Sequence, residues 1–429
     1  MEGYKSFAVK VTGRSHKNGV CQDYTGSYED EGVSIAVVAD GHGDSSCFRS
    51  DRGSMYAVNC AIKGIQQFVK EQEADFKRFI KKPSPPSRRG LEKLLHEQLI
   101  KQTVASWNRL VMTDYQKNPF TEQELENVSE KYRKRYEKGE TTNKAYGTSL
   151  IAAAITPWYW FGFHIGDGRF TVLYQDGSGS QPVPWDEKCY LNVTTSICDD
   201  DILDRYDDEE ERYTGVRTFL SMKEDEAPPI AFFICSDGVD DNYPVEENEE
   251  HLYKLYRKIA VTFVDYGYEA TCGQIEDLAK RFATEGKGDD TSLAGIINME
   301  ELKKAAPVLR EMIEAAEAKK AADKAAEAEE AKAAEKAAED AAARREARRA
   351  ERESEREATK AEEKAKAKAE KPKADAGKKP DSGENIETYG EFSSNAEQSG
   401  DDEAKSKAEL VQDAKKAIDE AAKKIDMLV

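Results

Sequence analysis

Four apolar, strand-like stretches of this 429-residue chain each carry an aspartate at one end. They lie at residues 37–43, 163–168, 234–238 and 288–293. Neighbouring strands of one sheet are about 4.8 Å apart, so aspartates that leave several strands on the same edge converge within reach of one ion. Carboxylate oxygens suit Mg²⁺, Mn²⁺ or Ca²⁺ rather than zinc. The pattern therefore predicts a sheet with a cluster of carboxylates at one edge.

An isolated Asp-Gly pair has a simpler interpretation, because Asp and Gly are typical residues of tight turns. Here the sites recur, and their surroundings follow one order along the chain. That order is Asp40–Gly43, Tyr146–Ser149, Gly166–Arg169, Ser236–Asp241 and Asp289–Ser292. The series resembles the protein phosphatase 2C family of metal-dependent serine/threonine phosphatases.

The resemblance extends from about Gly13 to Asn298. Upstream of the first block, the Gln22-Asp23 pair is similar to the bacterial branch of the family, in which such a pair precedes the Asp-Gly-His-Gly strand. The fold that the resemblance implies is α+β, with two packed antiparallel β-sheets flanked by helices and metals at one end of the sandwich.

The resemblance also implies a dinuclear Mg²⁺ or Mn²⁺ centre in which metal-bound hydroxide attacks the phosphorus. Asp40 is the expected bridge between the two ions, and the Gly41 carbonyl is expected to bind one of them. Asp237 and Asp289 are expected to bind the other ion. Asp23 is the expected companion of Asp40, orienting a metal-bound water.

Further roles follow from the same resemblance. Asp167 and Asp241 match the pair that holds a weaker third metal. His42 is the expected general acid, which protonates the departing serine or threonine oxygen. Asp289 is preferred over Asp290 as a ligand because it lies three residues before Ser292, the family's spacing, and Asp290 stays an alternative.

The residue that binds the substrate phosphate is less well marked. Many family members have an arginine shortly before the first aspartate, whereas Arg14 lies nine residues before Asp23. Arg49 is a second candidate. The chain also has Gln22, Asp44 and Asp240 where relatives have glutamate, glycine and tryptophan. None of these differences removes an expected core metal ligand.

Strands are expected at about 4–12, 33–39, 148–156, 159–174, 230–236 and 291–298, where apolar residues alternate or run continuously. Helical spacing predicts helices at 53–81 and 91–116, separated by prolines between them. The charged segments 117–145 and 186–229 are expected to be surface insertions or a flap near the active site.

The composition changes near residue 300, which predicts a phosphatase domain at 1–299 followed by an appendage. Of the net charge of −20, −14 falls on residues 1–299. Such an acidic surface disfavours nucleic acid and anionic membranes as partners. No signal peptide and no apolar run of about 18 residues is present, so a cytoplasmic location is expected. Seven cysteines without a C-x-x-C spacing indicate reduced packing residues.

The appendage divides into three parts. Residues 300–370 are rich in Ala, Glu, Lys and Arg, which predicts a long charged helix that is either a solvated single helix or a partly disordered spacer. Residues 371–403 have the composition of a disordered linker. Residues 404–429 are expected to form an amphipathic helix, which either packs on the enzyme domain or docks a partner or a second copy of the chain.

Two functions remain in view. The first is a phosphatase that acts on phosphoserine or phosphothreonine in proteins, the targets of a kinase. The second is a catalytically weak relative that acts as a binding or scaffolding module through its C-terminal tail. The complete set of ligand positions favours the enzyme, because a binding module has no need of a dinuclear centre.

Overall fold

Both faces of strand β3 (Ser34–Ala39) are buried, which places its sheet between two other layers. Its alternate residues Ile35 and Val37 face one apolar cluster, and Ala36 and Val38 face another. A strand with this pattern must have a covering layer on each side. The computed structural model describes residues 3–16, 19–30, 32–79, 87–183, 189, 193–203, 215–244 and 248–369.

Two five-stranded sheets provide the central layers, and every strand pair in them is antiparallel. The first sheet has the order β1 (Tyr4–Val11), β10 (Thr291–Asn298), β9 (Ala231–Cys235), β6 (Arg169–Leu173) and β7 (Gly179–Ser180). The second has the order β2 (Tyr24–Glu29), β3, β4 (Leu150–Ile155), β5 (Tyr159–Ile165) and β8 (Arg217–Met222). The predicted α+β sandwich is confirmed.

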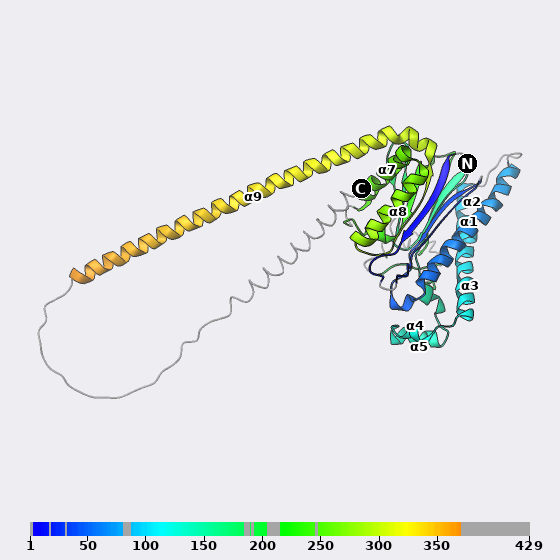
Figure 1. The fold of residues 1–429 in the computed structure, drawn as a ribbon, viewed down its shortest axis with the longest axis horizontal. Coiled ribbons are helices and arrows are strands. Elements are labelled where there is room, and N and C mark those ends of the chain that lie inside the picture. The colour runs from blue at the N-terminus through cyan, green and yellow to red at the C-terminus, as the bar shows by residue number, and fades with distance from the viewer. Residues whose placement is uncertain are drawn as a thin grey trace, which may run out of the picture. The chain divides into compact units, whose positions relative to one another are not determined.

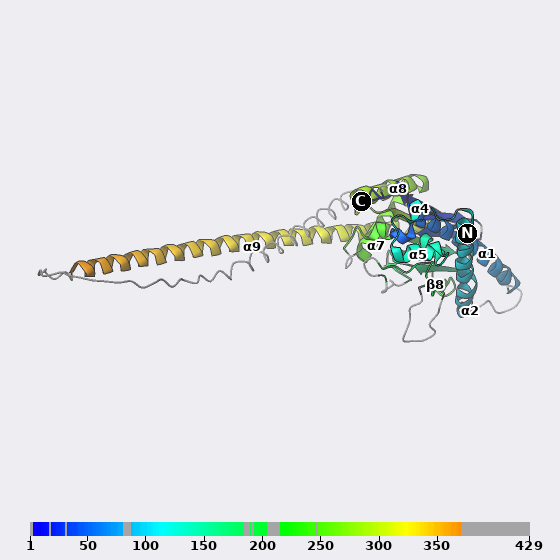
Figure 2. The same ribbon diagram turned by 90° about the horizontal axis from the view of Figure 1, so that it is seen from below.

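Helices cover the outer face of each sheet (Figures 1 and 2). The second sheet packs against α1 (Ser50–Phe79) and a long helix that comprises α2 (Arg88–Leu94), a π-helical turn (Leu95–Ile100) and α3 (Lys101–Lys117). The first sheet packs against α7 (Asn248–Tyr266), α8 (Tyr268–Glu285) and the start of α9 (Met299–Ala369). Short helices α4 (Glu122–Leu125), α5 (Glu130–Glu137) and α6 (Asp237–Asp240) complete the set of α-helices in the described residues.

Three apolar clusters separate these layers. The cluster between the sheets includes Trp160, Phe170 and Phe232, all of which are almost completely buried. Small residues on β3 and β4 and large aromatic rings on β6 and β9 complement each other there. Gly162 allows this close packing, because a Cβ at that position would lie 2.1 Å from the ring of Phe170.

The structure differs from the expected elements in three ways. The segment 186–229, expected to be a surface insertion, contains β8, which pairs with β5 at the edge of the second sheet. Strand β2 and helices α7 and α8 were also not predicted. The expected strand at 159–174 is two strands, because the chain turns at Gly166, with φ of 104°, and passes from the second sheet to the first.

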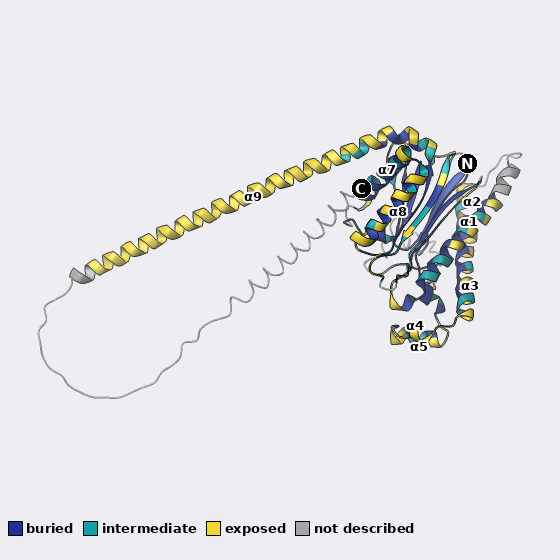
Figure 3. Ribbon diagram, in the orientation of Figure 1, coloured by how far each residue is buried: buried dark blue, intermediate teal, exposed yellow. Residues whose placement is uncertain are grey.

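The long charged helix is confirmed as α9. Its first turns belong to the core, since Leu302, Ala305 and Leu309 are buried in the apolar cluster that also contains residues of α7 and α8. The described residues fall into two units, one ending at Glu314 and one beginning at Ala315. From Glu317 to Ala365 the side chains are exposed (Figure 3). The predicted linker at 371–403 and helix at 404–429 lie outside the described residues, and no described helix is apolar and long enough to cross a membrane.

Candidate metal centre and active site

The strand register of the first sheet brings three predicted site segments to one end. Cys235, the last residue of β9, pairs with both Leu293 near the start of β10 and Arg169 at the start of β6. The segment that follows β9 and the segments that precede β10 and β6 therefore all lie at the same end of the strands. They carry Asp237, Asp289 and Asp167 respectively.

The second sheet contributes two more carboxylates at the corresponding end. Tyr24, which begins β2, pairs with Ala39, which ends β3. Asp23 and Asp40 are the next residues beyond this pair, so they are neighbours. Ser292 of the first sheet donates a hydrogen bond of 2.7 Å from its Oγ to Oδ2 of Asp23, which joins the two ends.

The Gly-Thr-Ser segment after Tyr146 holds the backbone of Asp40. The Asp40 N–H donates to Oγ of Ser149 over 3.0 Å, and the Ser149 N–H donates to the Asp40 carbonyl over 2.8 Å. Oγ1 of Thr148 donates to the same carbonyl over 2.7 Å. Gly41 must be glycine, because a Cβ there would lie 2.5 Å from the Gln22 carbonyl oxygen.

Burial and crowding make this group of carboxylates electrostatically strained. Burial raises the pKa of the Asp40 and Asp237 carboxyls well above the ordinary value, and neighbouring carboxyls raise it further. Burial likewise raises the pKa of Asp23 to about 6 and raises that of Asp167. A divalent cation would relieve this strain, because it supplies the opposite charge at short range.

The donor set fits a hard cation, since it consists of oxygen atoms. In the described residues no three histidine, cysteine or carboxylate side chains already surround one point at coordination distance. The carboxyls interact by hydrogen bonding instead, as Asp40 and Asp237 do.

Asp289 and Asp290 differ sharply in their surroundings. Asp290 is buried, and its two carboxylate oxygens accept hydrogen bonds from the backbone N–H groups of Gly13 (2.7 Å) and Gln22 (2.6 Å). The Asp289 side chain is 58% exposed, and its Oδ1 lies 3.3 Å from Nε2 of His16. Asp290 thus anchors the N-terminal loop, which leaves Asp289 as the more available oxygen donor.

Two outer aspartates are held by other groups. Thr194 donates a short hydrogen bond to Oδ2 of Asp167. Asp241 forms an ion pair of 2.8 Å with Lys287, at the far end of the short helix α6. Both residues lie at the end of the sandwich that carries the carboxylates, but each has a partner of its own.

His42 lies beside the strand end that carries Asp40. Its backbone N–H donates to the Gly147 carbonyl over 3.1 Å, and a Cβ on Gly147 would lie 2.9 Å from the ring carbon Cδ2. Burial, followed by the charge of Lys144, lowers the pKa of His42 to about 4. The imidazole is therefore neutral at pH 7, and its Nε2 is buried with no hydrogen-bond partner among the described residues.

The two arginine candidates occupy different places. The Arg14 guanidinium donates to the Gly286 carbonyl over 3.0 Å, in the connection between α8 and β10. Arg49 is buried, and its N–H groups donate to both carboxylate oxygens of Glu124, to the Tyr146 hydroxyl and to two backbone carbonyls. Arg49 was the second candidate for binding the phosphate, and it could do so only if some of these hydrogen bonds broke, because all five of its N–H groups already have acceptors.

The sequence did not reveal a buried ion pair beside this site. Nε of Arg169 lies 2.7 Å from Oδ2 of Asp240, and both side chains are under one tenth exposed. Asp240 occupies the position where relatives have tryptophan. The arginine at the end of the Gly-Asp-Gly-Arg block, Arg169, was the feature of the sequence that could have indicated a partner for it. The pair connects the start of β6 to α6 and thereby positions Asp237.

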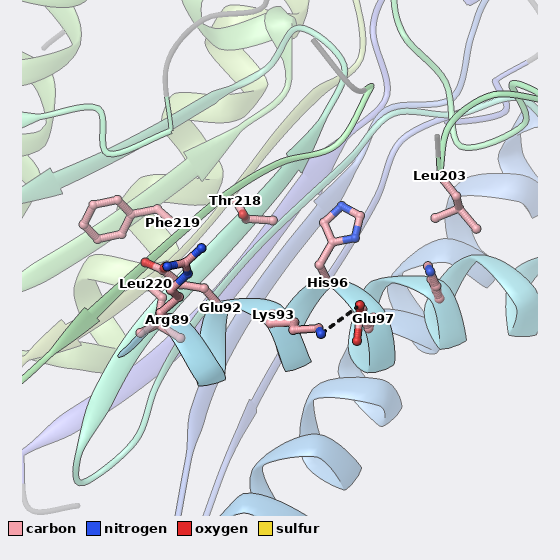
Figure 4. A pocket seen from close by; sticks show the side chains of 10 residues that line it. Arg89, Glu92, Lys93, His96, Glu97, Leu203, Thr218, Phe219 and Leu220 are labelled. Atoms are coloured by element: carbon pink, nitrogen blue, oxygen red, sulfur yellow. Dashed lines mark ion pairs between the residues drawn. The ribbon is translucent and has the colours of Figure 1, made fainter. Parts of the chain in front are cut away.

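A separate hollow of about 770 Å³ lies between α2, the π-helical turn and the edge strand β8 (Figure 4). Its charged residues include Arg89, Lys93 and Glu97, and the last two are 3.8 Å apart. None of the predicted metal ligands lines this hollow.

Comparison with known proteins gave a match to one protein family and several distant structural likenesses. No curated protein matches the chain. The Staphylococcus aureus serine/threonine phosphatase Stp1 is 13% identical, with 69% of this chain and 95% of that chain covered and a TM-score of 0.39. The Mycobacterium tuberculosis serine/threonine phosphatase PstP/Ppp is 14% identical, with coverages of 68% and 98% and a TM-score of 0.38.

These structural likenesses are too distant to carry an assignment. The sequence profile of protein phosphatase 2C, in contrast, matches residues 12–272, which is more than half of the chain. That match includes Asp23, Asp40, Asp167 and Asp237. The chain therefore belongs to the protein phosphatase 2C family.

Proposed function

We propose that this protein is a serine/threonine phosphatase that hydrolyses phosphoserine and phosphothreonine in proteins with the help of two Mg²⁺ or Mn²⁺ ions. The observation that carries the proposal is the meeting of Asp40 and Asp237, which come from different sheets and are buried together. Membership of the family supports it. The substrates in this proposal are proteins phosphorylated by a kinase.

The proposed ligands are all at one end of the sandwich. Asp40, the Gly41 carbonyl, Asp237 and Asp289 would hold the two ions. Asp23 would orient water beside them. When bound, the ions neutralise phosphoryl oxygens and lower the pKa of water, so that hydroxide is available at neutral pH.

Other residues have supporting roles in the proposal. Asp167 and Asp241 would hold a third ion, which requires Asp241 to leave Lys287. His42 would give a proton to the departing serine or threonine oxygen, because an alkoxide leaves poorly without one. The negative charge of a bound phosphate favours a protonated imidazole. Arg14 stays a candidate for binding the phosphate if it leaves the Gly286 carbonyl.

The test uses the full chain and two readouts. Hydrolysis of a phosphoserine peptide should require Mn²⁺ or Mg²⁺, stop with a chelator and fall at least ~100-fold in Asp40→Asn and Asp237→Asn. Calorimetric titration with Mn²⁺ should show weaker binding in the same variants. Asp265→Asn is the matched control, since Asp265 is on the surface and pairs with Arg310.

Hydrolysis by the chelated protein, or full activity in Asp40→Asn, would contradict the metal mechanism. A chain that binds metal but hydrolyses no phosphoprotein would favour the binding or scaffolding function instead.

A further inference from the structure

Helix α9 carries a row of arginines on one face, in a protein that is otherwise strongly acidic. Positions 345, 348, 349, 352 and 356 are all arginine, and all of these side chains are exposed. At 3.6 residues per turn, they lie within an arc of about 100° and extend about 16 Å along the axis. We call these five residues the arginine row.

Arginines four residues apart repel each other within the row, and Glu346 and Glu353, three residues from Arg349 and Arg356, offset only part of this repulsion. Arg345 and Arg349, Arg348 and Arg352, and Arg352 and Arg356 are each separated by four residues. Like charges at this separation destabilise a helix by a few tenths of a kcal/mol per pair. These side chains and Glu353 line an open hollow of about 500 Å³ on the surface of the helix. An anion in this hollow would relieve the repulsion.

The shape of the positive strip indicates what kind of anion fits. On the helix circumference, Glu346 and Glu353 lie on one side of the arginine row, and Glu351 and Glu355 lie on the other, where Arg344 widens the row only at its N-terminal end. The strip is therefore one row wide and about as long as five residues of extended chain. A nucleic-acid duplex would bring its phosphates over the flanking glutamates. Binding to a membrane would need large apolar side chains on the helix, and the other residues between Arg345 and Arg356 are only Ala, Ser and Glu.

We propose that the arginine row binds a segment of a protein substrate that carries more than one phosphate. Arginine suits this ligand, because its planar fork pairs with phosphate oxygens through two hydrogen bonds at once. The inference rests on the proposed phosphatase function. The catalytic region carries most of the chain's negative charge, so it repels phosphoproteins, and the row supplies a positive docking point on the same chain.

The experiment compares two full-length variants that lose equal charge from the same helix. One replaces the five arginines of the row with glutamine. The control replaces Lys319, Lys320, Lys324, Lys332 and Lys336 with glutamine, and these lysines are also exposed. The substrates are a peptide with three phosphoserines, a peptide with one, and an aryl phosphate. Circular dichroism checks that both variants keep their helix.

The row variant should raise KM for the triply phosphorylated peptide by about tenfold or more and leave kcat unchanged. The row variant should hydrolyse the aryl phosphate at the native rate. The lysine control should keep the native KM for the triply phosphorylated peptide. Added salt should raise the native KM toward that of the row variant.

Binding of the triply phosphorylated peptide, measured by fluorescence anisotropy with chelator present, tests docking independently of catalysis. An unchanged KM and unchanged binding in the row variant would overturn the proposal, and so would an equal effect of the lysine control. Tighter binding of duplex DNA or of phosphatidylserine vesicles than of the peptide would also overturn it. If the native chain does not hydrolyse the aryl phosphate, the proposed phosphatase function is contradicted, whereas docking of the phosphorylated peptide is judged by the binding measurement.

Discussion

Ser292 and Asp23 form a hydrogen bond that connects the two sheets at the end that carries the carboxylates. Oγ of Ser292, on β10, lies 2.7 Å from Oδ2 of Asp23, which precedes β2. Both side chains are buried. The backbone around Ser292 is fixed as well, since its N–H donates to Oγ of Ser236 over 3.1 Å.

We predict that Ser292→Ala lowers the free energy of unfolding by about 1–3 kcal/mol, because it removes a donor from a buried carboxyl. Urea unfolding with chelator present measures this effect without any contribution from metal. Ser178→Ala is the control, because its bond to Asp176 is on the surface. Equal stability of the two variants would show that the Ser292 bond is not structural.

Asp237→Asn should have opposite effects on stability and on metal binding. The amide avoids burying a charge among Asp40, Asp23 and Asp167, so the metal-free protein should unfold at a higher temperature. Each kcal/mol gained corresponds to about 2–4 °C for a domain of this size. Thermal unfolding with and without Mn²⁺ gives both results. A lower melting temperature in chelator would show that the carboxyl stabilises the fold.

His42→Ala should affect substrates according to their leaving group. An alkoxide needs a proton to depart and an aryl phenolate does not, so a phosphoserine peptide should be slowed by about 10²–10⁴ more than an aryl phosphate. Steady-state kinetics on both substrates measures the ratio. His251→Ala is a control on a histidine that stacks on Tyr243 outside the site. Equal slowing of both substrates would refute the general-acid role.

Arg49→Met should destabilise the protein without changing substrate affinity. The variant leaves Glu124 and the Tyr146 hydroxyl without their buried donor, and losing one member of a buried ion pair costs about 3–5 kcal/mol. Denaturant unfolding and KM together test this. Arg88→Gln, which removes an exposed pair with Glu92, should change stability by less than about 1 kcal/mol. A raised KM with unchanged stability would instead support the phosphate role of Arg49.

Lys223 should make stability depend on pH in the alkaline range. Burial lowers its pKa from the ordinary 10.5 to about 8, so the unfolded chain binds the proton more tightly than the folded one. The stability penalty is complete below pH 8 and disappears as the pH rises toward 10.5. Lys223→Met should therefore melt higher than the native protein at pH 7, and the gap should narrow at pH 10. A gap that does not change with pH would contradict the lowered pKa.

The sequence predicted the parts of the fold that have a strong local pattern. Strands β3, β4, β9 and β10 are continuous apolar runs, and the pattern is sufficient to find them. Strand β8 was missed because Thr218 and Phe219 are only half-buried at a sheet edge, where neither alternation nor a continuous run is required. Strand β2 has no apolar run and no fully buried residue, so its pairing with β3 decides its structure.

The candidate site was predictable where a residue lies next to a strand end and not where long-range contacts decide its role. Asp40 and Asp237 follow apolar strands, so their place at the sheet edge follows from local sequence. Arg49 and Asp290 have the right residue type for phosphate and metal, but partners far along the chain take up their hydrogen bonds. No local pattern indicates those partners.

The division of the carboxylates between the two sheets makes the site sensitive to residues that never touch it. Asp40 moves with β3 and Asp237 moves with β9, so a small slide of one sheet over the other would change their separation. The rings of Trp160, Phe170 and Phe232 set how closely the sheets approach. A substitution among these rings is therefore expected to alter ion affinity from a distance, and the Kd for Mn²⁺ becomes a gauge of how well the interior is packed.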